Sequence, residues 1–317
     1  MSESPAAARS VLYRVCHETL YHYANPVTNA RQLAHLQPRS TGWQRVLQSE
    51  VKIDPAPGEL DGDEDYFGNR VLRFAIDGAH DSLEVIACSE VEVLPHAPAP
   101  DSDSPAWRTA LAIPTDFHAP GALDIMQYRV GSAQAPLMSE AGAYAAQSFN
   151  GNRPWLDALY ELTRRMRADF KYDTKATTVF TPVADVLARR AGVCQDFAHL
   201  MISALRSLGM SARYVSGYIR NDRAKTSATP GATPSAASGT DPATEALTGA
   251  DASHAWVSAY CPGHGWVDVD PTNGKIADTE FITVAWGRDF SDVTPLRGVV
   301  LGDGGQKLEV RVSVTAI

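Results

Sequence analysis

The stretch Gly192-Val193-Cys194-Gln195-Asp196-Phe197-Ala198-His199-Leu200 decides the fold of the second half of the chain. A helical stripe of apolar residues begins directly after it, and Gly209 is suited to end that helix. The stripe consists of Phe197, Met201, Ala204, Leu205 and Leu208. We therefore expect Cys194 at the N-terminus of a buried helix, where backbone N–H groups and the helix dipole favour a thiolate and can hold an oxyanion.

Two side chains farther along the chain supply what a nucleophilic thiol needs. His254 follows Cys194 by 60 residues, and Asp270 follows His254 by 16 residues. An imidazole can take the thiol proton and form an ion pair with the thiolate. A carboxylate on the other ring nitrogen would hold the imidazole in one tautomer and orientation. Cys194, His254 and Asp270 are therefore the candidate site residues for acyl transfer.

A hairpin prediction tests whether the histidine and the aspartate can meet. Alternating residues on both sides of the loop Cys261-Pro262-Gly263 predict two antiparallel strands. This register places His254 directly opposite Asp270, about 4.5–5.5 Å apart at Cβ. Asp268 would be a more distant diagonal neighbour on the same face. A slip of one residue would put the histidine and Asp270 on opposite faces, so the choice of Asp270 over Asp268 depends on the register.

Each of these residues also has an ordinary structural interpretation. A single cysteine at a helix start is commonly a small buried apolar residue, and a single histidine on a sheet is commonly structural. The order of the three residues and the compatible hairpin favour a shared site. We expect His199 to be structural and His264 to be exposed. Neither histidine, combined with its nearest cysteine, completes a four-ligand zinc set, so no metal and no cofactor are expected.

Composition limits the classes of function. The chain has 317 residues, 44% of them apolar, and a formal net charge of −9. Because no basic stripe is present, a nucleic-acid partner is not expected. No apolar run reaches the length of a membrane span, and the first ten residues lack the apolar core of a secretory signal. The four cysteines contain no CxxC pair and do not read as a disulfide framework, so we expect a cytoplasmic location.

The hydrophobic period changes along the chain. Residues 1–98 are expected to form an antiparallel, sandwich-like β domain, because apolar and polar residues alternate, most clearly over 83–93. Residues 99–145 read as a linker and connecting segment. Residues 146–317 read as helices followed by an antiparallel sheet, and so as an α+β core. Within this core, residues 221–253 are rich in Thr, Ala, Pro, Ser and Gly and are expected to be a mobile insertion.

Four motifs in this order resemble the transglutaminase-like superfamily in its bacterial form. They are GVCQDFAHL at 192–200, ARYVSGY at 212–218, HAWVSAY at 254–260 and GHGWVDVDPTNG at 263–274. The stretches HETLYHYANPV at 17–27 and DYFGN at 65–69 resemble the β-rich domain that accompanies this core in bacterial members. Together these resemblances extend over nearly the whole chain.

The resemblance implies a papain-like core in which a helix carries the cysteine and an antiparallel sheet carries the histidine and the aspartate. By motif position, Cys194 would be the nucleophile, His254 the base and Asp270 the orienting carboxylate. Papain-type enzymes use a glutamine about six residues before the cysteine for the oxyanion, and that position is Ala188 here. Animal transglutaminases have tryptophan after the cysteine, whereas this chain has Gln195. The backbone N–H of Cys194, at the helix start, is the expected first oxyanion donor, and the sequence does not identify a second one.

The leading expectation is a cysteine hydrolase or acyltransferase that acts on a peptide or protein amide. Hydrolysis is favoured over cross-linking, because cross-linking needs a site that excludes water and admits an amine, and no motif indicates one. Two alternatives stay open. One is protein-glutamine transamidation. The other is a non-catalytic module that binds peptides, although such a module has no need of all three side chains.

Overall fold

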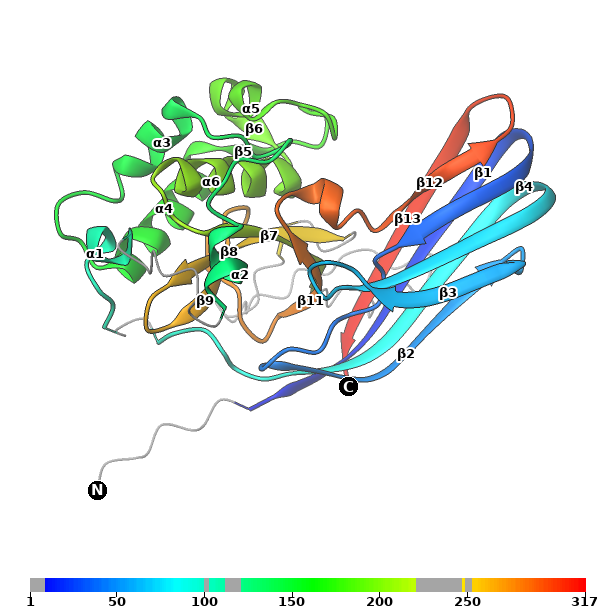
Figure 1. The fold of residues 1–317 in the computed structure, drawn as a ribbon, viewed down its shortest axis with the longest axis horizontal. Helices are drawn as coiled ribbons and strands as arrows, with labels where there is room; N and C mark the ends of the chain where they lie inside the picture. Colours follow the sequence, from blue (N-terminus) through cyan, green and yellow to red (C-terminus); the bar gives the residue numbers. More distant parts are fainter. Residues whose placement is uncertain (1–8, 100–102, 112–120, 221–246, 249–252) are drawn as a thin grey trace, which may run out of the picture.

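The computed structural model describes residues 9–99, 103–111, 121–220, 247–248 and 253–317, in two parts that lie side by side (Figure 1). One part is a sheet of long antiparallel strands, and the other combines helices with a smaller antiparallel sheet. The architecture is therefore α+β with a β-rich N-terminal region, as expected. None of the helices in the described part of the chain is long and apolar enough to cross a membrane. Of the segment 221–253, expected to be a mobile insertion, all but Leu247, Thr248 and Ser253 lies outside the described residues.

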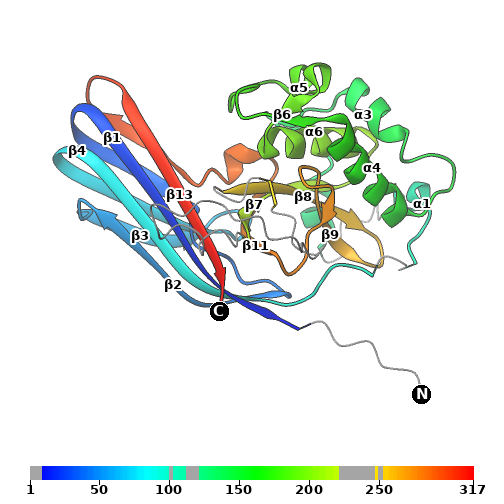
Figure 2. The same cartoon turned by 180° about the vertical axis from the view of Figure 1, so that it is seen from behind.

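The larger sheet has six strands, and its long strands double back. β1 pairs with β13 over Tyr13–Tyr23 and with β12 over Asn29–Ala34, with a register shift against β4 in between. The sheet thereby folds over on itself into two layers that share an apolar core (Figures 1 and 2). This is the sandwich-like domain expected from the alternation. Its strands are β1 (Val11–Ala34), β2 (Gln44–Asp54), β3 (Glu59–Glu64), β4 (Arg70–Val93), β12 (Leu296–Leu301) and β13 (Gln306–Ala316).

The C-terminal strands lie elsewhere than expected. We had placed residues 146–317 together in the core, but β12 and β13 pair with β1 in the larger sheet. The physical reason is that β1 would otherwise be an unpaired edge with exposed backbone N–H and C=O groups. Most of β13 is exposed, and its buried side chains are Val312 and Val314. The hydrophobic pattern of β13 therefore gives little indication of where this strand packs.

Two of the four cysteines form a disulfide, which corrects the expectation that the cysteines form no disulfide framework. Cys16 and Cys88 are bonded across 72 residues of sequence. They are direct cross-strand partners in the antiparallel pair of β1 and β4, with Cα atoms 4.2 Å apart. Strand pairing thus brings together two thiols that sequence spacing keeps far apart.

The core is built around one helix, α6 (Cys194–Ser207). It packs on a five-stranded sheet of order β10-β9-β8-β7-β11. Gly209 adopts a φ of 86°, and Met210 N–H bonds to Leu205 O at 3.1 Å, so the glycine ends the helix as predicted. The strands are β7 (Ala212–Ile219), β8 (His254–Cys261), β9 (Gly265–Asp270), β10 (Lys275–Ile276) and β11 (Phe281–Gly287).

Helices α3 and α5 pack beside α6, whereas the 3-10 helix Phe290–Asp292 follows β11 and lies between the smaller sheet and β12 (Figure 1). Several of the helices fall in residues 99–145, expected to be a connecting segment. A short parallel pair, β5 (Lys171–Tyr172) with β6 (Ala191–Gly192), leads into α6. The helices are α1 (Trp107–Leu111), α2 (Ala122–Met126), α3 (Ser139–Ala146), α4 (Trp155–Asp169), α5 (Val183–Arg189) and the 3-10 helix Phe290–Asp292.

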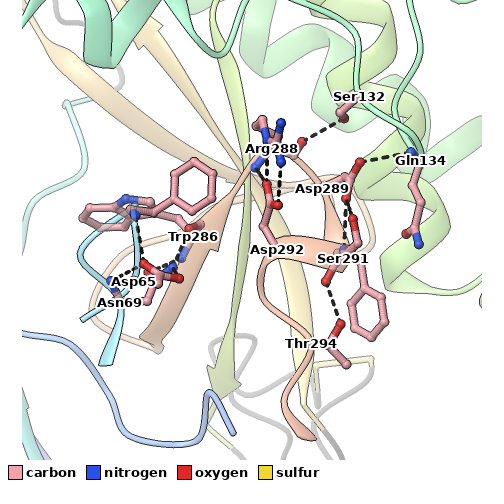
Figure 3. A network of polar contacts seen from close by, with 12 residues as sticks. Asp65, Asn69, Ser132, Gln134, Trp286, Arg288, Asp289, Ser291, Asp292 and Thr294 are labelled. Carbon is pink, nitrogen blue, oxygen red and sulfur yellow. Dashed lines mark hydrogen bonds and ion pairs between the residues drawn. The ribbon is translucent and has the colours of Figure 1, made fainter. Parts of the chain in front are cut away.

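The DYFGN stretch joins the two parts of the molecule. Asn69 is fully buried, accepts from Trp286 N–H at 2.9 Å and donates to Trp286 O at 2.8 Å (Figure 3). Asp65 accepts from the Asn69 side chain at 2.8 Å. A second link is the 3.0 Å hydrogen bond between His17 Nδ1 and Tyr218 Oη. These contacts hold the larger sheet against β7 and β11, so this motif has a structural role between the two parts.

Candidate active site

Cys194 is the first residue of α6, as the sequence indicated. Its side chain is partly exposed. Val193 before it is extended, with a φ of −115° and a ψ of 179°, so the chain turns into the helix at the thiol. The first N–H groups of a helix have no acceptor within the helix. The thiol therefore lies beside unpaired backbone donors and the positive end of the helix dipole.

Asp196 holds this turn, a role that we had not predicted. Its Oδ2 accepts from Val193 N–H at 2.8 Å and from Thr177 Oγ1 at 2.5 Å. The side chain is buried, and this burial raises the pKa of the carboxyl group. A Cβ on Gly192 would lie 2.7 Å from Asp196 Oδ2, which explains the glycine at that position. The signal was the acid three residues after the N-cap, which is half of a capping box.

The register of the β8–β9 hairpin differs from the prediction by two residues. Ser258 pairs with Asp268 and Cys261 with Gly265, so the loop is 262–264 rather than 261–263. Gly263 and Gly265 both have positive φ, 87° and 77°, so the tight turn centres one residue later. His254 is therefore not directly opposite Asp270. Because the change is an even number of residues, both still lie on the same face.

His254 and Asp270 nevertheless meet. His254 Nε2 lies 2.9 Å from Asp270 Oδ2, and both side chains have 0% exposure. Nδ1 is the other ring nitrogen; it is buried and makes no hydrogen bond of regular geometry within the described residues. Burial by itself lowers the pKa of His254, but Asp270 and Cys194, by charge and hydrogen bonding, raise it to about 10. The structure thus brings Cys194, His254 and Asp270 together around one imidazole.

Asp270 is held by the turn that follows it. Its Oδ1 accepts from the backbone N–H groups of Thr272 at 2.8 Å and Asn273 at 3.2 Å. Its Oδ2 accepts from Asn273 Nδ2 at 2.7 Å. Burial raises the pKa of this carboxyl group, but His254 and these hydrogen bonds outweigh the burial and lower it overall. Asp270 is therefore an ionised acceptor in a fixed orientation.

Asp268, the other aspartate on this face, has different partners. Its Oδ2 accepts from Trp256 Nε1 at 3.1 Å. It also lies near the buried Arg213, whose pKa is lowered to about 10 by burial and partly restored by the Asp268 charge. That guanidinium stacks on the rings of Trp266 at 4.2 Å and Trp286 at 3.7 Å. Asp268 thus compensates a buried cation instead of orienting His254.

The two other histidines that we had considered lie outside this arrangement. His199 is buried, and its Nε2 accepts from Phe290 N–H at 3.1 Å. Burial lowers the pKa of His199 to about 4, so it is neutral and structural as expected. His264 is exposed in the hairpin loop, also as expected. In the described ranges, no group of three or more His, Cys, Asp or Glu side chains could hold a metal ion.

Two family descriptions match the chain. The bacterial transglutaminase-like N-terminal region matches residues 13–92, and the transglutaminase-like superfamily matches residues 142–271. The second match contains Cys194, His254 and Asp270. The chain therefore belongs to the transglutaminase-like superfamily.

Similar proteins extend over most of the chain. An uncharacterized protein of Mycobacterium tuberculosis (strain ATCC 25618 / H37Rv) is 35% identical over 297 residues, which are 91% of this chain and 87% of that protein. One of Mycobacterium leprae (strain TN) is 31% identical over 304 residues, 96% of this chain and 98% of its own. The crystal structure of a candidate cysteine protease from Cytophaga hutchinsonii has a TM-score of 0.72 at 18% identity and covers 98% of this chain and 92% of its own. It has the same fold.

Proposed function

We propose that this chain is a cysteine hydrolase that cleaves a peptide or amide bond through Cys194, His254 and Asp270. The observation that carries the proposal is the position of the His254 ring. Its Nε2 is taken by Asp270 at 2.9 Å, and Nδ1 is left for the Cys194 thiol. Membership of the superfamily and the fold shared with a candidate cysteine protease support a cysteine-based reaction.

In the first half of the reaction, His254 Nδ1 takes the proton of the Cys194 thiol. Sγ then forms a bond to the carbonyl carbon of the substrate, and the oxyanion lies near the backbone N–H of Cys194. The imidazolium returns its proton to the leaving nitrogen as the C–N bond breaks. An amine leaves, and the acyl group stays on Cys194 as a thioester.

In the second half, a water molecule replaces the amine. His254 takes a proton from the water, the hydroxide adds to the thioester carbonyl, and the C–S bond breaks. The products are a carboxylic acid and the free thiol. Throughout both halves Asp270 keeps the ring in one tautomer and stabilises the imidazolium, without taking its proton.

Transamidation would share every step up to the thioester and would differ in the second nucleophile, a primary amine instead of water. A peptide-binding module would share the geometry but form no thioester. One experiment separates the three. Incubate the protein with a peptide library and a fluorescent primary amine, quench with acid, and measure the intact mass and the released products.

Hydrolysis predicts a Cys194 acyl adduct and free acid as the main product even when the amine is present. Amine adducts as the main product would favour transamidation. Binding without any adduct would overturn an enzymatic function. Cys194→Ala and His254→Ala should both abolish the adduct, and Cys261→Ala is the matched control because that thiol lies in the same core but is buried.

The redox state of the cysteines bears on the cellular compartment of the protein. We expected the cytoplasm, but the Cys16–Cys88 bond is typical of an oxidising compartment. Acid quenching of intact cells, followed by alkylation of free thiols under denaturing conditions, decides between the two compartments because every free thiol is then accessible. Two blocked thiols would indicate an oxidised pair at its native location. Four blocked thiols would support a cytoplasmic location.

A further inference from the structure

An exposed apolar turn accompanies the thiol. Val179 is 50% exposed and Phe180 is 85% exposed. Two hydrogen bonds close the turn around them. Thr181 N–H donates to Thr178 O at 3.0 Å, and Thr178 N–H donates to Thr181 Oγ1 at 2.9 Å. The two apolar residues therefore lie at the tip of a turn whose backbone is held by hydrogen bonds.

Both sides of this turn are tied to the residues that follow Cys194. Gln195 Nε2 donates to Val179 O at 3.4 Å. Thr177 Oγ1 donates to Asp196 Oδ2 at 2.5 Å. The apolar turn is thus hydrogen-bonded to the same helical turn that presents the thiol. These hydrogen bonds reach the two residues directly after Cys194, so the apolar turn is a neighbour of the helix start at which a substrate would be attacked.

We propose that Val179 and Phe180 bind a large apolar side chain of the substrate, on the acyl side of the bond that Cys194 attacks. This inference rests on the proposed function and names the substrate class: peptides with an aromatic or branched aliphatic residue at that position. Apolar burial supplies the recognition, because the exposed ring of Phe180 loses water contact when such a side chain covers it. A small or charged side chain gains no such contact.

The test compares two peptidyl acyloxymethyl ketones that are identical except for phenylalanine or alanine next to the ketone. Their second-order rates of Cys194 modification are measured by intact mass, with iodoacetamide as a reagent that has no side chain. The natural chain should prefer the phenylalanine probe by about tenfold or more. Phe180→Ser should lose most of that preference, and Val179→Ser should lose part of it. Leu60→Ser, which changes a 57% exposed leucine on β3, should retain it.

The outcomes are distinct. Equal rates for the two probes, or an unchanged preference in Phe180→Ser, would overturn this inference while leaving the cysteine chemistry in place. No modification by either peptidyl probe would overturn the proposed function and this inference with it. If Phe180→Ser changed the mass of the assembly in solution and left the preference intact, the turn would be an interface between two copies of the chain. That result would also overturn this inference.

Discussion

Asn273 shares one carboxylate oxygen with His254. Its Nδ2 donates to Asp270 Oδ2 at 2.7 Å, and the same oxygen lies 2.9 Å from His254 Nε2. Asn273 also bonds to the backbone of Thr248, accepting from its N–H at 2.8 Å and donating to its C=O at 3.3 Å. Asn273 is therefore a positioning residue for the carboxylate that orients the imidazole.

Replacing Asn273 should weaken the site without removing it. Hydrogen bonds to charged groups contribute about 1.5–3 kcal/mol, so Asn273→Ala should slow Cys194 acylation roughly 10- to 100-fold. Acylation is followed with a chromogenic ester of a peptide. The conservative variant Asn273→Gln, with the same amide on a longer side chain, should recover part of the rate. Equal rates in Asn273→Ala and the natural chain would show that the two backbone donors suffice to orient Asp270.

Replacing Asp270 and replacing Asp268 should have clearly different effects. Asp270→Asn leaves the shape but removes the charge that holds the His254 tautomer, and we expect kcat to fall by about two to four orders of magnitude. Asp268→Asn should keep most of kcat but lower Tm, because it leaves the buried Arg213 without its countercharge. Both quantities are measured on the same preparations. A larger loss of kcat in Asp268→Asn would contradict the assignment.

The cysteines should differ in reactivity. Cys194 is partly exposed at a helix start beside His254, whereas burial raises the pKa of the Cys261 thiol to about 12. Limited iodoacetamide treatment followed by peptide mapping should therefore label Cys194 well before Cys261. Cys16 and Cys88 should become labelled after reduction. His254→Ala should slow the labelling of Cys194 and leave that of Cys261 unchanged. Similar rates at Cys194 and Cys261 would argue against an activated thiol.

Stability should pass through a maximum near pH 6.5. The pKa of His254 is raised from 6.5 to about 10 in the folded chain. Its contribution to the free energy of unfolding is therefore complete below pH 6.5 and is lost as the pH rises towards 10. Burial lowers the pKa of His17 and of His199 from 6.5 to about 4, so their contributions are complete above pH 6.5 and are lost as the pH falls towards 4.

Urea unfolding at pH 4.5, 6.5 and 8.5 measures both sides of this maximum. His254→Gln should flatten the alkaline side, and His17→Gln should flatten the acidic side. A natural chain whose free energy of unfolding rises steadily from pH 6.5 to 8.5 would contradict the raised pKa of His254.

Local patterns predicted the faces of the site but not its exact pairing. The alternation through His254 and through Asp270 depends on a period of two residues, so both side chains were correctly placed on one face. The register depended on which residues form the loop, and two glycines with positive φ allowed two solutions. Asp196 and Asn273 were missed, although an acid in the first helical turn and an Asp-Pro-Thr-Asn-Gly turn are both readable signals.

Contacts between segments far apart in the sequence could not be predicted from local sequence patterns. The Cys16–Cys88 bond requires knowing that β1 pairs with β4 in one particular register. The place of β13 requires knowing that an edge of β1 is open. Neither fact is encoded within a window of neighbouring residues. The helix headed by Cys194 was predictable because its apolar stripe, its start and its closing glycine all lie within sixteen residues, from Cys194 to Gly209.

The pairing of β12 and β13 with β1 sets an order of events during synthesis. β1 to β4 leave the ribosome first, and the strands that pair with the outer edge of β1, β12 and β13, follow only after the entire core has been made. The core, whose elements are consecutive between β4 and β12, can therefore fold while one edge of β1 is still open. The six-stranded sheet is completed last. Until then the newly made chain carries an edge that can pair with another chain, and a truncation before β12 would leave that edge permanently available.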